Sequence, residues 1–265
     1  MTTRNRTIAI TGSASGMGAA TTARLAAAGL RVIGIDQHNA DVIADLSTPD
    51  GRSHAIAAVR DRSDGVLDGL VTWAGLSGLS KYPANLVASV NYFGTVALLE
   101  GLQPLLAAGD NPAAIAISSN STTCVPRVSL ELTEACLSGD EAAAAAIADG
   151  VGSLATYPAS KLAVAWWVRK HAASADWAGA GITLNAVAPG TVETPLLQAS
   201  REDPVIGKFV DAFPVPVGRA ASPDELAAFV EFLLGPNARF FCGSVIFVDG
   251  GTDALLRGTS VPTPM

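Results

Sequence analysis

The sequence predicts a single doubly wound α/β domain with a parallel sheet over residues 1–265. Short runs of apolar, β-branched residues alternate with longer, alanine-rich segments of helical pattern. The strand-like runs are apolar throughout, which is typical of parallel strands that are buried on both faces. No stretch with the composition of a linker interrupts this alternation. These three observations favour one sheet with helices on both sides.

Strands are expected at six apolar runs, residues 7–11, 31–35, 69–73, 113–118, 182–187 and 244–248, with a short strand-like run at 41–44. Helical patterns occupy residues 16–28, 53–60, 84–106, 156–173 and 224–233. Gly29 ends the first of these helices. Ser222 and Pro223 start the last one with a favourable N-cap and a favourable first position.

Three segments depart from the alternation. Residues 120–153 lie between a strand and a helix, and their alanine run at 142–146 predicts a helical insertion. Residues 195–217 are rich in Leu, Val, Phe and Pro. From residue 257 onward the chain is rich in Pro and Thr, and we expect this end to be mobile.

Composition excludes several classes of protein. Hydrophobic residues make up 49% and charged residues 15% of the chain, which carries a net charge of −7, so a disordered chain is excluded. The acidic balance argues against a nucleic-acid partner and against anionic membranes. The longest uncharged stretch, residues 82–99, contains polar residues and favours a buried helix over membrane insertion. We recognise no signal peptide and expect a cytoplasmic protein.

No metal site and no disulfide framework is expected. The cysteines and histidines show none of the spacings that such sites need; they are Cys124, Cys136, Cys242, His38, His54 and His171.

A glycine-rich loop joins the first predicted strand to the first helix. Its candidate cofactor-binding residues are Gly12, Ser15, Gly16, Met17 and Gly18. Glycines let a backbone turn tightly and approach a pyrophosphate closely, and the N–H groups of the next helix can bind the phosphates. The alternative is a tight strand-to-helix turn without a ligand, but the flanking strand and helix favour the functional interpretation.

An acidic residue ends the second predicted strand. Asp36 can accept hydrogen bonds from both hydroxyls of an adenosine ribose and would repel a 2′-phosphate, and neither position 13 nor Gln37 supplies a cation. The sequence therefore predicts NAD rather than NADP as cofactor. Asp45 and Leu46 follow the short strand-like run. They could contact the adenine edge, or Asp45 could cap a turn, and the pattern leaves both open.

Tyr157 and Lys161 are four residues apart, which places them on one face of the predicted helix. A nearby ammonium lowers the pKa of a phenol, so we expect Tyr157 to exchange a proton with a substrate oxygen. Ser119 follows the fourth strand, at the edge where doubly wound sheets bind ligands, and could hydrogen-bond a reacting carbonyl. Asn91, inside the long helix, is either a structural bridge or the anchor of a proton-relay water.

These motifs, together with Ala74-Gly75 and Pro189-Gly190, resemble the short-chain dehydrogenase/reductase family in order and context over about residues 6–251. The resemblance implies a Rossmann-type fold, with Tyr157 as general acid/base and Lys161 as its helper and a ribose ligand. It further implies Ser119 as carbonyl orienter and Asn91 as relay. Cofactor contacts are implied at Ala74, Gly75, Pro189 and Gly190, and at Val192 and Thr194, which would hold the nicotinamide amide.

Within the family, several stretches resemble bacterial hydroxysteroid dehydrogenases/carbonyl reductases, among them residues 34–48, 89–94, 193–199 and 248–251. The insertion between Ser119 and Tyr157 resembles them as well, and implies a homodimer rather than the common homotetramer. Trp73 departs from the family pattern, in which Asn or Cys more usually precedes Ala74-Gly75.

The resemblance makes residues 195–217 a lid over the nicotinamide. Its apolar residues predict a hydrophobic alcohol or ketone as the small-molecule partner, unless they only pack on each other. The expected activity is NAD-dependent interconversion of a hydrophobic secondary, cyclic alcohol and its ketone. A monoterpenoid alcohol dehydrogenase is the alternative substrate class. A non-catalytic nucleotide sensor is disfavoured by the intact Tyr/Lys pair, and a lyase or epimerase by the lack of an extra substrate domain.

Overall fold

The computed structural model describes residues 5–126 and 128–261 of the chain. It has a seven-stranded sheet in the order β3-β2-β1-β4-β5-β6-β7, and every pairing is parallel. The strands are β1 (Thr7–Thr11), β2 (Arg31–Asp36), β3 (Val42–Ile43), β4 (Gly69–Thr72), β5 (Ala113–Ile117), β6 (Thr183–Pro189) and β7 (Val245–Val248). The predicted fold class, a single Rossmann-like α/β domain, is confirmed.

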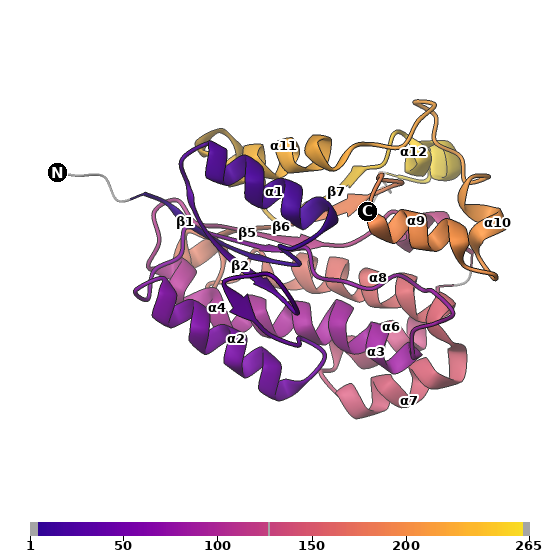
Figure 1. Cartoon of the computed structure of the whole chain (residues 1–265), viewed down its shortest axis with the longest axis horizontal. Coiled ribbons are helices and arrows are strands. Elements are labelled where there is room, and N and C mark those ends of the chain that lie inside the picture. The colour runs from indigo at the N-terminus through magenta and orange to yellow at the C-terminus, as the bar shows by residue number, and fades with distance from the viewer. Residues whose placement is uncertain (1–4, 127, 262–265) are drawn as a thin grey trace.

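Helices cover both faces of the sheet (Figure 1). They are α1 (Gly16–Ala27), α2 (Pro49–Arg62), α3 (Ala84–Ala88), α4 (Thr95–Ala107), α5 (Ser121–Cys124), α6 (Leu130–Leu137), α7 (Glu141–Val151), α8 (Ser153–His171), α9 (Pro195–Glu202), α10 (Gly207–Val210), α11 (Pro223–Leu234) and α12 (Thr252–Arg257). One core packs α2, α4 and α8 on the sheet, and a second core packs α1 and α11 on the opposite face.

The strands supply both cores because their side chains alternate between the two faces. In β1, Ala9 belongs to the first core and Ile8 and Ile10 belong to the second, and all three are fully buried. A continuously apolar strand is therefore the sequence signature of this central position.

The strand order reverses between β1 and β4, since β2 and β3 lie on one side of β1 and the later strands on the other. Ligands of doubly wound sheets bind at the carboxyl ends of the strands at this switch point. The loop after β1 carries Gly12 and the loop after β4 carries Gly75, so both predicted glycine motifs meet there.

Several element boundaries differ from the prediction. Helix α2 starts at Pro49 rather than at residue 53, because Thr48 caps it through a 3.1 Å hydrogen bond from the N–H of Gly51 to its hydroxyl. The long helix predicted at 84–106 is divided by a π-helix, Ser89–Gly94. Helix α12 was not predicted. It ends at Arg257, where the segment that was expected to be mobile begins. A 3-10 helix, Gly258–Ser260, follows it, and residues 262–265 lie outside the described residues.

The insertion and the lid both contain helices. Residues 120–153 form α5, α6 and α7, of which α6 packs on α8, and α7 on α3. The segment 195–217 forms α9 and α10. Among the described residues, no helix is both long enough and apolar enough to cross a membrane.

Candidate active site

The glycine loop after β1 is too crowded for side chains. At Gly12, which has φ +67°, an added Cβ would lie 2.8 Å from the backbone nitrogen of Ala74, and at Gly18 it would lie 2.0 Å from the oxygen of Gly12. Helix α1 starts after Ser15, whose side chain makes no capping hydrogen bond. The first N–H groups of α1 thus remain available to an anion, as a phosphate-binding loop requires.

Asp36, at the end of β2, is fixed beside this loop. One carboxylate oxygen accepts a hydrogen bond from the N–H of Ala14 at 3.0 Å, and the other accepts one from the N–H of Gln37 at 2.7 Å. Each oxygen keeps a lone pair for a further donor. Asp45 caps a turn, because its Oδ1 accepts from the N–H of Ser47 at 2.9 Å and from Nε2 of Gln37 at 3.2 Å.

A cavity of about 540 Å³ runs along the loops after β1, β2 and β4 and reaches the lid. Of the predicted cofactor residues, it is lined by Gly12, Ser15, Gly16, Met17, Gly18, Asp36, Gln37, Leu46, Ala74, Gly75 and Thr194. The cavity lining does not include the other predicted site residues, which are Asp45, Asn91, Ser119, Tyr157, Lys161, Pro189, Gly190 and Val192. The structure therefore gathers the predicted phosphate and ribose residues around one cavity and places the predicted catalytic residues outside its lining.

Asn91 is fully buried within the π-helix and holds the loop after β4. Its Oδ1 accepts from the N–H of Leu76 at 2.8 Å, and its Nδ2 donates to the oxygen of Leu76 at 2.9 Å and to the hydroxyl of Ser160 at 3.2 Å. A Cβ at Gly75 would lie 3.1 Å from Oδ1 of Asn91. Of the two roles left open by the sequence, this geometry makes Asn91 a structural bridge, and the relay water stays a prediction.

Lys161 ties helix α8 to the sheet. Its Nζ donates to the oxygen of Ile117, the last residue of β5, at 2.9 Å, and its own oxygen accepts from the hydroxyl of Ser118, also at 2.9 Å. Its side chain lies beside the loop after β4, since a Cβ at Gly75 would be 3.2 Å from Nζ. Burial lowers the pKa of Lys161 to about 8.

The side chains of Tyr157 and Ser119 are joined by a hydrogen bond. Burial raises the pKa of the Tyr157 phenol above its ordinary value, and the hydrogen bond with Ser119 works in the opposite direction. The expectation that Lys161 lowers the pKa of Tyr157 is therefore wrong for this structure. The ammonium of Lys161 bonds to Ile117, and desolvation of the phenol dominates.

The segment before the lid is held in place by close contacts. A Cβ at Gly190 would lie 2.6 Å from the Cα of Asp249, so this position has no room for a side chain. Thr194 caps α9, because its hydroxyl accepts from the N–H of Leu197 at 3.2 Å, and the same hydroxyl donates to the oxygen of Val192 at 3.2 Å. The start of the lid is thereby tied to Val192, and the side chain of Thr194 faces Gly16.

A second cavity, of about 440 Å³, lies between the insertion and the lid. Leu154, one turn before Tyr157 in α8, and Val205 of the lid both line it, and both side chains are about half exposed. Tyr82 lines this cavity as well as the larger one. The two cavities are therefore neighbours at the mouth of the site.

Comparison with known proteins places this geometry in a family. Residues 6–129 match the family model described as short chain dehydrogenase, and residues 141–253 match the one described as enoyl-(acyl carrier protein) reductase. A 3-alpha-hydroxysteroid dehydrogenase/carbonyl reductase of Comamonas testosteroni is 44% identical, over 95% of this chain and 98% of that protein. The chain belongs to the short-chain dehydrogenase/reductase family.

Two further proteins are similar to this short-chain dehydrogenase/reductase along most of its length. The crystal structure of a 3-alpha-hydroxysteroid dehydrogenase from Pseudomonas sp. B-0831, complexed with NADH, superposes with a TM-score of 0.92, at 51% identity over 96% of this chain and 99% of that chain. A coniferyl-alcohol dehydrogenase of Pseudomonas sp. strain HR199 is 31% identical over 93% of this chain and 96% of that protein. The resemblance drawn from the motifs is confirmed.

Sequence reasoning missed part of the cavity wall of this short-chain dehydrogenase/reductase. The missed lining residues include Ala44, Leu86 and Val90. Leu86 and Val90 are four residues apart, just before Asn91, and this helical spacing could have indicated one shared face. Trp73, noted as a departure from the family pattern, is buried and lines the cavity, and its indole N–H bonds to the hydroxyl of Thr21 at 2.9 Å. In the part of the chain that the structure describes, no cluster of metal ligands is found.

Proposed function

We propose that this chain is an NAD(H)-dependent oxidoreductase that interconverts a hydrophobic secondary alcohol, of the hydroxysteroid class, and its ketone. The observation that carries the proposal is the Tyr157–Ser119 pair beside the buried Lys161, at the same sheet edge as the glycine-loop cavity. The relatives from Comamonas testosteroni and Pseudomonas sp. B-0831, both 3α-hydroxysteroid dehydrogenases by name, support it.

The residues of the larger cavity fit a dinucleotide. The glycines let the backbone turn tightly against Ala74, and the uncapped start of α1 supplies N–H donors for a pyrophosphate. Asp36 would accept the ribose hydroxyls and would repel a 2′-phosphate, which favours NAD over NADP. Gln37 and Leu46, which line the cavity, would border the adenine. The family resemblance assigns the nicotinamide amide to Val192 and Thr194.

When bound, the nicotinamide ring would supply or accept the hydride. Tyr157 would transfer the proton to or from the substrate oxygen, and the hydroxyl of Ser119 would orient that oxygen. A bound cofactor would also give Lys161 ribose hydroxyls as partners.

The substrate is proposed to be large and apolar. Leu154 and Val205 present half-exposed apolar side chains on opposite walls of the smaller cavity, next to the turn of α8 that carries Tyr157. A polycyclic alcohol such as a steroid would cover both side chains, whereas a small aliphatic alcohol would leave them in water. A cyclic monoterpenoid alcohol remains the alternative substrate.

One spectrophotometric screen tests this proposal. The absorbance of reduced nicotinamide is followed with NAD⁺ and NADP⁺ against 3α-hydroxysteroids, monoterpenoid alcohols and small aliphatic alcohols. We expect the highest kcat/KM with NAD⁺ and a 3α-hydroxysteroid. A preference for a monoterpenoid would select the alternative, and no turnover with any alcohol would refute an alcohol dehydrogenase.

We further propose a cytoplasmic homodimer. Helix α6 of the insertion packs on α8 and would occupy a surface through which family members assemble into tetramers. Cys124, Cys136 and Cys242 are free thiols, as is usual in a reducing compartment. Light scattering after size-exclusion chromatography distinguishes a dimer from a tetramer, and cell fractionation tests the location.

A further inference from the structure

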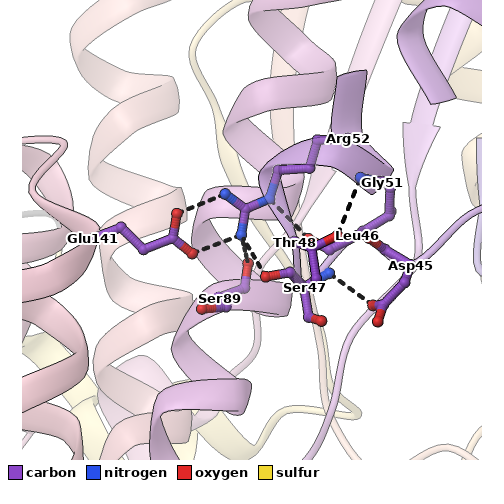
Figure 2. A network of polar contacts seen from close by, with 8 residues as sticks. All are labelled: Asp45, Leu46, Ser47, Thr48, Gly51, Arg52, Ser89 and Glu141. Atoms are coloured by element: carbon purple, nitrogen blue, oxygen red, sulfur yellow. Dashed lines mark hydrogen bonds and ion pairs between the residues drawn. The ribbon is translucent and has the colours of Figure 1, made fainter. Parts of the chain in front are cut away.

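A buried arginine connects the insertion to the nucleotide cavity. Arg52, in the first turns of α2, is 6% exposed and donates five hydrogen bonds. Its Nη1 and Nη2 bind the two carboxylate oxygens of Glu141, at 2.7 and 2.6 Å, and Figure 2 shows this fork between α2 and α7. Glu141 is the first residue of α7, so the only carboxylate that pairs with Arg52 among the described residues comes from the insertion.

The remaining donors of Arg52 hold backbone oxygens next to the cavity. Nε donates to the oxygen of Leu46 at 2.8 Å, and Nη2 donates to the oxygen of Ser47 at 3.1 Å (Figure 2). Leu46 lines the larger cavity at the end where Asp36 lies. The same turn is closed from its other side by Asp45, which accepts from the N–H of Ser47 at 2.9 Å.

Arg52 also reaches the opposite wall of the cavity. Its Nη2 shares its two hydrogens among three acceptors, and the third acceptor is the oxygen of Ser89 at 3.3 Å. Ser89 is the first residue of the π-helix, and the next residue, Val90, lines the cavity. One guanidinium thus bridges the two walls between which the adenine would lie, while Glu141 supplies its counter-charge.

The counter-charge is needed because a buried guanidinium without one is costly. Burial works to raise the pKa of Glu141, but hydrogen bonds from Arg52 and Ser89 outweigh it and leave the pKa below its ordinary value, so the carboxylate is ionised at neutral pH. If this charge were removed, the guanidinium would move toward water. It would then release the oxygens of Leu46, Ser47 and Ser89 together.

We propose that the insertion is a positioning element for the adenine half of the cofactor, acting from Glu141 through Arg52 on the Leu46–Ser47 turn and on Ser89. This inference rests on the proposed cofactor site. Neither Glu141 nor Arg52 touches the cavity, so both are positioning residues. The catalytic group is held independently, because Lys161 and Ser118 link α8 directly to β5.

The test compares the affinity for ADP-ribose, which carries the adenine half of NAD without nicotinamide, with the rate of turnover. Glu141→Gln keeps the shape of the side chain and removes the charge. We expect its Kd for ADP-ribose, measured by calorimetry, and its KM for NAD⁺ to rise about tenfold, the scale of coupling through one positioning contact. The kcat at saturating NAD⁺ should stay within about twofold of wild type, since the chemistry is anchored elsewhere.

Glu131→Gln is the matched control, because it makes the same charge change in the first turn of α6, within the same insertion, and Glu131 does not pair with Arg52. It should bind ADP-ribose as the wild type does. Arg52→Lys keeps the positive charge but cannot hold three carbonyls and a carboxylate at once, so it should reproduce the loss. The double variant Arg52→Lys/Glu141→Gln should bind ADP-ribose no more weakly than Arg52→Lys alone, because both residues act through the same contact.

A lower melting temperature of Glu141→Gln with unchanged ADP-ribose affinity would overturn the inference, because the pair would then only stabilise the fold. An equal loss of kcat and of affinity would overturn it as well. If Glu141→Gln does not fold, Glu141→Asp, which keeps the charge and withdraws it by one methylene, is measured in the same way. Failure of the wild-type enzyme to bind ADP-ribose would instead refute the proposed cofactor site itself.

Discussion

Asp203 of the lid binds Ser80, in the loop after β4, through two hydrogen bonds to one carboxylate oxygen. The N–H of Ser80 donates at 2.9 Å and its hydroxyl donates at 2.8 Å. The other oxygen of Asp203 accepts from the N–H groups of Val205 and Ile206, at 2.9 and 3.2 Å. One carboxylate thus orders the lid and fastens it across the mouth of the site.

We expect Asp203→Asn to loosen the lid, because an amide cannot accept from all four donors. The KM for the alcohol should rise about tenfold, the scale of one lost charge-assisted hydrogen bond. Hydrogen exchange of the lid amides should quicken. Asp224→Asn, in the first turn of α11, is the control and should change neither quantity. An unchanged KM with unchanged exchange would show that this contact does not hold the lid.

The same contact between Asp203 and Ser80 predicts that the order of the lid depends on pH. Burial raises the pKa of Asp203, but the hydrogen bonds from Ser80, Val205 and Ile206 outweigh it and lower the pKa to about 2. The unfolded value is about 3.9. The contribution of this carboxylate to the stability of the folded lid is therefore complete above about pH 4, and it is lost as the pH falls toward 2. The protection factors of the lid amides, which correct for the intrinsic pH dependence of exchange, should be constant above that pH and fall below it, whereas in Asp203→Asn this fall should be absent.

Tyr157→Phe removes the hydroxyl and keeps the ring. Because positioned acid/base groups contribute about 10² to 10⁴ in rate, kcat should fall by roughly 10³. Binding of NADH, followed by fluorescence titration, should persist, since Tyr157 does not line the larger cavity. Turnover near the wild-type rate would refute the assignment of Tyr157 as the acid/base, and loss of nucleotide binding would show that the hydroxyl of Tyr157 holds the cofactor.

Asp36→Ser tests the choice of cofactor. The substitution removes the negative charge that would face a 2′-phosphate and leaves one hydroxyl. Since like charges in contact cost several kcal/mol, the ratio of kcat/KM for NAD⁺ to that for NADP⁺ should fall by about a hundredfold. Steady-state kinetics with both cofactors measure the ratio. Gln37→Asn, a neutral change at the neighbouring position, should leave it nearly unchanged.

The burial of Lys161 is predicted to lower the stability of the folded protein when this side chain is charged. Its pKa is about 8 in the folded protein and about 10.4 in an unfolded chain, so the unfolded state binds more protons between these values. Stability therefore rises with pH in this window. Relative to Lys161→Met, the free energy of unfolding of the wild type should increase by about 3 kcal/mol from pH 8 to pH 10.5. Denaturant unfolding across this range checks the slope, and a constant difference would contradict it.

The sequence by itself determined the architecture and the chemical character of the site. Apolar strands alternating with helical patterns are local signals, and they predicted the parallel sheet. The glycine loop and Asp36 meet at one cavity because the ends of β1 and β2 are adjacent in any sheet of this class. The spacing of Tyr157 and Lys161 placed both on one helix face for the same local reason.

The tertiary structure alone decided how those residues are paired and charged. The partner of a buried polar group depends on which distant segments pack around it, and no local pattern encodes that choice. Arg52 finds Glu141 in the insertion, Asn91 closes on Leu76, and Asp203 closes on Ser80. The pKa of Tyr157 is raised rather than lowered, because burial of the phenol outweighs its hydrogen bond with Ser119.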